Sequence, residues 1–484
     1  MRKLLIYTAV LSFIFTSCSK DLTEKFNVDT KSPEAVPAGM LFANAQKDMA
    51  RYLASPNVND NTMKLWAQHW TQTTYTDESN YELTERNING RTFNKLYADV
   101  LRDLMEARNG VEIDEFATEG EKNTQNAMID VMEVFTYQTL VDVFNDVPYS
   151  EAIQLVDNLA PAYDDAESIY RDLISRLDKD IEVLGGGASG AFAGYDLIYG
   201  GDVGAWTSFA HSIKLRMAIR MADVDDASAR TWATEAIDGA FSSSADDARF
   251  YFESSAPNTN PLWEDLVQSG RTDYIASKTL ADAMNSTMDP RRSAFFRNLG
   301  SDSASGDMNV VLGNPHGAGG SYANFSQPSD MLENPTLNSP YITFTEVEFL
   351  RADAAARWGI GGSAADHFNN AVAASTSEWG TPVTSADSMF SATVDYDAQL
   401  SAGKTWKEVI GTQKWIAMYN QGNEAWNTWK LYDFPVMAVA AEAGTTPPTR
   451  YNYSVDEYSV NGSNASAANG GSDDRFDKVF WDVN

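Results

Sequence analysis

The chain has 484 residues, with 68 acidic and 36 basic side chains and a net charge of −32 at pH 7. This excess of negative charge argues against a nucleic-acid partner, whose phosphates would be repelled, and against adsorption to anionic lipid. The length allows a large core, in one big domain or in two closely packed ones. Cys18 is the only cysteine, so no internal disulfide can form.

Residues 1–17 have the layout of a secretory signal peptide. A short basic head precedes an apolar run at residues 4–15, which is too short to span a bilayer permanently. Cys18 follows directly, which favours a bacterial lipoprotein signal with Cys18 as the attachment point of a lipid such as palmitate. A leucine is usual three places before such a cysteine, and this chain has Phe15 there. A plain secreted protein, or a chance cysteine, is the alternative.

Amphipathic helices are the main pattern after a polar, turn-rich tether at residues 18–36. Residues 166–184 place apolar side chains on one helical face, with Asp164 or Asp165 as the N-cap and Gly185 at the end. A capping box from Thr345 to Glu348 is expected to open another helix. Successive helices of this kind, over about 40–240 and 341–435, predict a mostly α-helical, tetratricopeptide-like scaffold; a plain helical bundle is the alternative.

Two stretches lack the helical pattern. Residues 241–340 are rich in Gly, Pro, Asn and Ser with scattered aromatic residues, and residues 444–484 are polar and rich in small residues. Long irregular segments inside a compact protein are usually functional loops. We therefore expect the ligand-binding half of the molecule at 241–340, together with an exposed excursion at 444–484.

No catalytic or metal-binding motif is present. The chain has no HExxH, GxxxxGK[ST] or GxSxG sequence, and its four histidines are far apart. His211 falls on an apolar helix face, where a structural role is expected. With 68 acidic residues, close carboxylate pairs arise by chance, so a glycosidase pair cannot be inferred from them. We expect no catalytic residue, no metal and no cofactor.

Aromatic and amide side chains gather at residues 65–84, where Trp66, Trp70, Tyr75 and Tyr81 alternate with Gln and Asn. Flat rings stack on the apolar faces of sugars, and amides hydrogen-bond to hydroxyls, so the mixture suits an oligosaccharide or peptide platform. The alternative is that Trp66 and Trp70, four residues apart, share a buried helix face. We favour burial for Trp66 and a surface role for Tyr75 and Tyr81, which follow the expected helix end.

Five stretches together resemble the SusD/RagB family of outer-membrane lipoproteins, in its SusD-like branch. In chain order they are NVDTKSP (27–33), FNDVPYSEA (144–152), STMDPRR (286–292), EVEFLRADAAARWG (346–359) and IGTQKWIAMYNQGNEAWNTWKLYDFP (410–435). The last is the most specific. This chain departs from the family at 430–433, where Lys-Leu-Tyr-Asp replaces the usual Arg-Arg-Thr-Gly.

The resemblance implies a single domain over residues 37–484, in which tetratricopeptide-like helix pairs support an irregular, loop-rich half. It implies a protein anchored only through the lipid on Cys18 and displayed on the outer face of the outer membrane. There it would act as the lid of a SusC-like TonB-dependent transporter, capturing an oligosaccharide, or sometimes a peptide, without covalent chemistry.

Loop placement and side-chain chemistry suggest six ligand-binding candidates. They are Trp70, Tyr75, Asn80, Tyr81, Trp263 and Tyr322. Trp415 and Trp426 are expected in the core, and Asp289–Arg291 in a turn at a helix end. Two other functions remain open: a surface glycoside hydrolase, with a carboxylate pair across an aromatic cleft, and a helix-repeat scaffold for protein interaction.

Overall fold

The computed structural model describes residues 36–154, 157–187 and 191–483. The chain divides into two units, Met1–Pro37 and Ala38–Asn484. The expected signal peptide, Cys18 and residues 18–35 of the expected tether lie outside the described residues. No helix among those described is long and apolar enough to cross a membrane.

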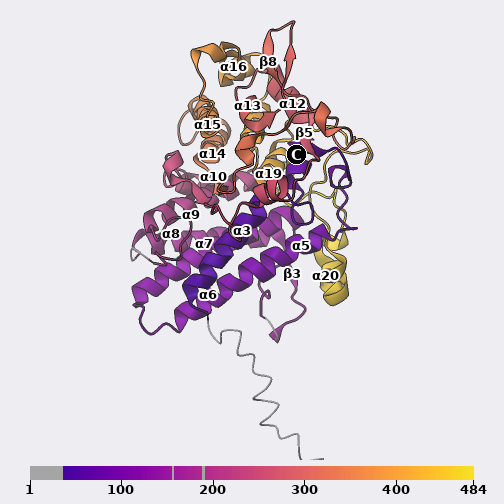
Figure 1. Ribbon diagram of the computed structural model, residues 1–484. Coiled ribbons are helices and arrows are strands. Elements are labelled where there is room, and N and C mark those ends of the chain that lie inside the picture. Colours follow the sequence, from indigo (N-terminus) through magenta and orange to yellow (C-terminus); the bar gives the residue numbers. More distant parts are fainter. Residues whose placement is uncertain (1–35, 155–156, 188–190, 484) are drawn as a thin grey trace, which may run out of the picture. The chain divides into compact units, whose positions relative to one another are not determined.

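The first part of the larger unit is a scaffold of helices that pack against their neighbours in the chain (Figure 1). Its helices are α3 (Ala38–Ala54), α4 (Met63–Trp66), α5 (Ile88–Asn94), the π-helix η2 (Lys95–Leu101), α6 (Arg102–Glu112), α7 (Glu119–Phe144), α8 (Ala166–Gly185), α9 (Val203–Met221) and α10 (Asp226–Ala236). The pairs α7–α8, α8–α9 and α9–α10 are in contact, and α3 packs on α6. A second set of helices completes the scaffold further along the chain: α14 (Phe344–Trp358), α15 (Ala364–Glu378), η8 (Ser385–Asp387), α16 (Ser388–Val394), α17 (Tyr396–Ser401), α18 (Trp406–Ala417) and α19 (Gly422–Tyr432).

The loop-rich half contains short elements only. Its helical turns are η1 (Glu78–Asn80), η4 (Ser244–Asp246), α11 (Pro261–Trp263), η5 (Glu264–Gln268), α12 (Lys278–Ser286), α13 (Arg292–Phe295), η6 (Tyr322–Asn324) and η7 (Asp330–Leu332). The C-terminal stretch forms α20 (Val455–Val460), α21 (Gly462–Ala467) and η9 (Ala468–Gly471). The expected mostly α-helical fold, with helix pairs supporting an irregular half, is confirmed.

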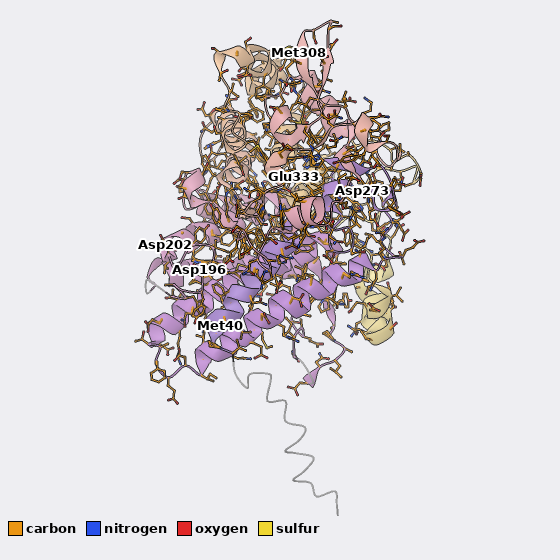
Figure 2. All side chains as sticks on the ribbon, in the orientation of Figure 1. Met40, Asp196, Asp202, Asp273, Met308 and Glu333 are labelled. Carbon is orange, nitrogen blue, oxygen red and sulfur yellow. The ribbon has the colours of Figure 1, made fainter. Side chains whose placement is uncertain are left out.

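Five antiparallel ladders, each of two short strands, connect the described loops. They are β1 (Trp70–Gln72) with β5 (Tyr274–Ala276), β2 (Val147–Pro148) with β3 (Tyr163–Asp164), β4 (Ala248–Phe250) with β10 (Ser339–Ile342), β6 (Phe296–Arg297) with β9 (Gln327–Pro328), and β7 (Gly300–Asp302) with β8 (Asp307–Val310). The β7–β8 hairpin carries the exposed Met308, which lies in β8 and is labelled in Figure 2. Three of these ladders join segments that are far apart in the chain.

Helix caps explain where several helices begin. The Asp165 carboxylate accepts a hydrogen bond from the Ser168 N–H and starts α8, as the sequence predicts. The start predicted for α14 is wrong by two residues, because Thr343 is the N-cap and its hydroxyl accepts from the Glu346 N–H. Thr345 is buried inside the helix. The helix ends at Gly359, as expected, where φ is +68°.

Tryptophans and paired charges fill the interior. Trp66, Trp415 and Trp426 are fully buried, as predicted, and the rings of Trp66 and Trp426 meet edge to face at 5.5 Å. A buried ionic network joins α9 to three other helices. Its pairs are Arg216 with Glu346, and Arg220 with both Asp142 and Glu424. Because each of these charges has a partner, burying it does not leave it uncompensated.

Candidate functional site

Tyr75 is the most accessible of the six ligand candidates, with 74% of its surface exposed. It lies in the loop between β1 and η1, in the left-handed region at φ +53°. Backbone hydrogen bonds hold this loop from both sides, because the Thr73 N–H donates to Asp273 O (2.8 Å) and the Gly320 N–H donates to Thr73 O (2.9 Å). Figure 2 marks the position of Asp273. The ring therefore projects from a fixed backbone, as stacking on a ligand requires.

Asn80 joins three loops through its side-chain amide. Its Nδ2 donates to Thr76 O and Gly317 O, both at 3.0 Å. Its Oδ1 accepts from the N–H groups of Glu442 (2.9 Å) and Ala443 (3.1 Å). Both of its polar atoms thus bind backbone groups of three loops, and the role of Asn80 in ligand binding stays a prediction.

Trp70 and Tyr81 lie in the core, with 1% and 0% of their surfaces exposed. The Trp70 indole N–H donates to the Tyr419 hydroxyl at 2.9 Å, and the Tyr81 hydroxyl accepts from Gln68 Nε2 at 3.0 Å. The Tyr81 backbone is left-handed (φ +68°), at the end of η1. Packing and hydrogen bonds occupy both rings in the described structure, which contradicts the surface role expected for Tyr81; the part of either ring in ligand binding stays a prediction.

Trp263 and Tyr322 are half-buried. Tyr322 opens η6, and its loop is bonded to the Tyr75 loop through Gly320 and Thr73. Trp263 ends α11, which packs against α3. The structure thus joins the Tyr75 and Tyr322 loops, and it places Trp263 on another element. Their roles in binding stay predictions.

A pocket of about 260 Å³ brings together aromatic and amide side chains that the sequence did not single out as a set. We call it the Tyr251 pocket; its lining is Arg249, Tyr251, Met331, Leu337, Asn338, Pro340, Glu378, Trp379, Tyr419, Asn420 and Gln421. Tyr251 is 64% exposed, and Arg249 forms an ion pair with Glu378 at 2.7 Å. Tyr251 also borders a second hollow of about 340 Å³. Its lining includes Met40, which is labelled in Figure 2. Four separate segments build the pocket, so no local pattern could have revealed it.

The described residues contain no group of three or more His, Cys, Asp or Glu side chains arranged to hold a metal ion. Two of the histidines, His69 and His316, are buried, and desolvation lowers the pKa of each to about 3. They are therefore neutral at physiological pH. The chemistry offered at the surface is ring stacking, amide hydrogen bonding and one ion pair, which suits a neutral polar ligand.

Residues 30–454 match the family described as "Starch-binding associating with outer membrane". The chain belongs to this SusD-like family. Membership places it among outer-membrane-associated, carbohydrate-binding proteins. No curated protein matches its sequence.

Solved structures of SusD-like proteins share its fold. A structure titled as a chitin-binding protein has 26% identity and a TM-score of 0.76, covering 92% of this chain and 100% of the other. A chitin-binding SusD homologue from Flavobacterium johnsoniae has 22% identity and a TM-score of 0.77, covering 92% and 99%. A SusD-like protein of Bacteroidetes AC2a has 19% identity and a TM-score of 0.79, covering 93% and 100%. The last two are similar in fold alone.

Proposed function

We propose that this protein captures an oligosaccharide at the cell surface and delivers it to a SusC-like TonB-dependent transporter, acting as the transporter's lid. Residues 1–17 would direct export, and the lipid on Cys18 would hold the protein on the outer face of the outer membrane. Binding would involve no turnover. The observation that carries this proposal is the exposed Tyr75 ring on its fixed loop, in a chain of a carbohydrate-binding family.

The physical basis is stacking. A rigid, exposed aromatic ring covers the apolar face of a sugar at a small entropic cost, because its backbone is already fixed. Tyr322, on the bonded neighbouring loop, would extend the platform to a second sugar. The chitin-binding relatives make chitin oligomers a natural ligand to test besides starch.

The test is binding of the chain from Ser19 onwards to starch and chitin oligomers, by affinity electrophoresis and calorimetry, with reducing-end release assayed in the same samples. We expect binding without release. Tyr75→Ala should weaken binding about ten-fold, the loss typical of a residue that contributes over 1 kcal/mol at an interface.

Phe116→Ala is the matched control, because Phe116 is an aromatic residue 96% exposed on the turn between α6 and α7. It should leave the affinity unchanged. Equal affinity of the Tyr75 variant and the unaltered protein would refute the platform. Release of reducing ends would refute the non-enzymatic function.

A further inference from the structure

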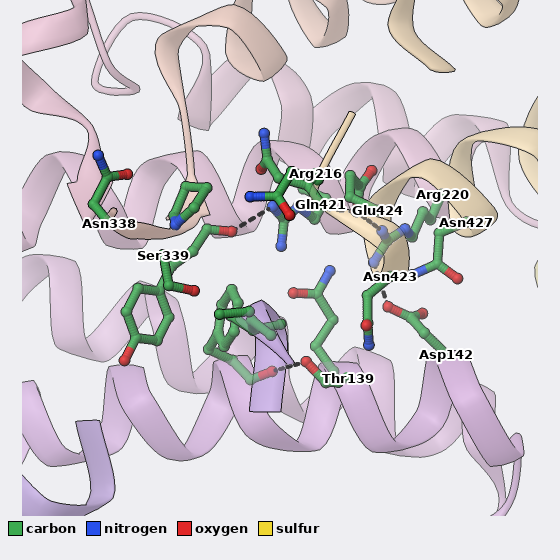
Figure 3. Close-up of a pocket in the computed structure, with 17 residues that line it drawn as sticks. Thr139, Asp142, Arg216, Arg220, Asn338, Ser339, Gln421, Asn423, Glu424 and Asn427 are labelled. Carbon is green, nitrogen blue, oxygen red and sulfur yellow. Dashed lines mark hydrogen bonds and ion pairs between the residues drawn. The ribbon is translucent and has the colours of Figure 1, made fainter. Parts of the chain in front are cut away.

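A polar cavity of about 40 Å³ lies behind the Tyr251 pocket, among α3, α7, α9, β10 and α19 (Figure 3). In Figure 3, Thr139 and Asp142 project from α7 on one side, and Asn423 and Glu424 face them from α19. The cavity and the Tyr251 pocket share four lining residues. These are Asn338, Pro340, Asn420 and Gln421. The two hollows therefore meet at these residues.

Five polar side-chain atoms on the cavity wall have no hydrogen-bond partner within the described structure. They are Gln138 Oε1 and Nε2, Ser339 Oγ, Asn420 Oδ1 and Asn427 Oδ1. Gln138 and Ser339 are each 1% exposed, and Asn427 is 6% exposed. A buried polar group without a partner loses the hydrogen bonds that it makes in water, and native interiors contain few such groups. Such a concentration around one cavity indicates a polar occupant.

The unpaired atoms on the cavity wall suit a neutral occupant. The charges on the wall are already paired: Arg216 binds the Glu346 carboxylate through Nε (2.7 Å) and Nη2 (2.6 Å), and Arg220 bridges Asp142 and Glu424. The atoms left over belong to amides and a hydroxyl. These atoms offer more acceptors than donors, so a water molecule or an alcohol group can form hydrogen bonds with them.

The cavity is also too small for a sugar ring. An apolar cavity that holds benzene measures about 150 Å³, whereas one ordered water needs roughly 10–15 Å³. The 40 Å³ therefore fits a few waters or one short arm of a sugar. The Tyr251 pocket, at 260 Å³, is slightly below the ~300 Å³ at which drug-sized sites begin, and it suits about one sugar unit.

We propose that the pocket and the cavity form one specificity subsite, in which the Tyr251 pocket takes a neutral hexose unit and the cavity takes its hydroxymethyl arm. The hydroxyl of the arm donates to one of the unpaired amide oxygens and accepts from Gln138 Nε2, replacing ordered water. The inference rests on the proposed function for its ligand class. It adds a preference for hexoses over pentoses, which lack this arm.

The test compares cellotriose with xylotriose, which have the same linkage and differ in the hydroxymethyl arms, by calorimetry on the chain from Ser19 onwards. Maltotriose and chitotriose are measured alongside. We expect at least one hexose trimer to bind about ten-fold or more tightly than xylotriose, since the hydroxyl contributes two or three hydrogen bonds of about 1 kcal/mol each.

Gln138→Leu should remove this preference by lowering the affinity for the hexose trimer towards that for xylotriose. Because leucine replaces an unpaired buried amide with an apolar group of similar size, the variant should melt at or above the temperature of the unaltered protein. Ser339→Ala, a smaller change, should reduce the preference in the same direction. Tyr251→Ala should weaken binding of both sugars.

Three outcomes would overturn the inference. One is equal binding of the hexose and pentose trimers, which means that the cavity holds water only. The second is a hexose preference that survives in Gln138→Leu. In both cases a loss of binding in Tyr75→Ala would leave the proposed function standing. The third is a failure of every glycan to bind, which would refute the proposed function and this inference together.

Discussion

His69 is buried with its ring against Trp415 (4.9 Å between ring centres) and Tyr419 (5.7 Å). Its Nε2 is 3.0 Å from Trp415 O, to which it donates a hydrogen bond. Desolvation, with a smaller contribution from Lys64, lowers its pKa from 6.5 to about 3. As the pH falls below 6.5, the imidazole therefore becomes protonated in the unfolded chain while it stays neutral in the folded chain. The contribution of His69 to the free energy of unfolding is fully present above pH 6.5 and is lost as the pH falls towards 3.

We expect the free energy of unfolding to fall by about 1.4 kcal/mol per pH unit below pH 6.5 through this residue alone. Between pH 7 and pH 5, the free energy of unfolding measured in urea should fall by about 2 kcal/mol less in His69→Gln than in the unaltered protein. The same loss in both would contradict the assignment.

His367 supplies a control of opposite sign. A hydrogen bond to the Glu348 carboxylate (3.0 Å) raises the pKa of His367. The contribution of His367 to the free energy of unfolding is therefore present below pH 6.5 and is lost as the pH rises. His367→Gln should therefore lose more stability than the unaltered protein between pH 7 and pH 5.

Sequence reasoning found exposure at Tyr75 and burial at Trp66, because each followed from position relative to a helix. It did not predict that Tyr81 is buried or that the Asn80 amide is bonded to three loops. Nothing in the residues around Asn80 shows that the backbones of 317 and 442–443 will arrive there, so its bonded state is a tertiary property.

Arg291 connects the turn before α13 to two scaffold helices, with none of its side chain exposed. Its guanidinium binds the Asp289 carboxylate at 2.6 Å, Ser375 of α15 at 2.9 Å and Gln413 of α18 at 3.1 Å. The sequence correctly predicts a turn at a helix end here. The hydrogen bonds from Arg291 to α15 and α18 are seen only in the structure.

Arg291→Met should reduce the free energy of unfolding by about 3–5 kcal/mol, because it leaves the Asp289 carboxylate buried without a counter-charge. Denaturant unfolding measures this loss. The double variant with Asp289→Asn should be less destabilised than Arg291→Met alone, since the uncompensated charge is gone. A double variant that is still less stable would show that the other contacts of Arg291 dominate.

Helix boundaries illustrate a different limit of prediction. Two overlapping capping sequences begin α14, Thr343 to Glu346 and Thr345 to Glu348, and both fit the pattern. The structure caps the helix at Thr343 without the reciprocal bond of a capping box, because the Glu346 side chain binds Arg216 (2.7 Å) and that of Glu348 binds Arg351 (2.8 Å). The choice of N-cap therefore depends in part on Arg216, which lies more than 100 residues before Glu346 in the chain. A local sequence pattern does not contain this information.

The whole molecule carries a net charge of −32, and its buried charges are largely paired. The excess therefore lies at the surface, where like charges repel and destabilise the compact state. Raising NaCl from 10 to 200 mM shortens the screening distance from about 30 Å to under 10 Å. We expect the melting temperature to rise by on the order of a few °C.

Scanning calorimetry at fixed pH measures this shift, and KCl should give the same result as NaCl if screening is the cause. A melting temperature that falls with salt would instead mean that surface ion pairs outweigh the repulsion.

The ladders of the loop-rich half have a consequence for how such a protein can evolve. A two-stranded ladder is marginally stable by itself, and those formed by β1 with β5 and by β4 with β10 draw their strands from distant parts of the chain. A gene fragment carrying the Tyr75 or Tyr251 loop would arrive in a new host without its partner strand. Exchange between related genes should therefore preserve the unit Ala38–Asn484 whole, while new ligand preferences arise by single substitutions at the loop tips.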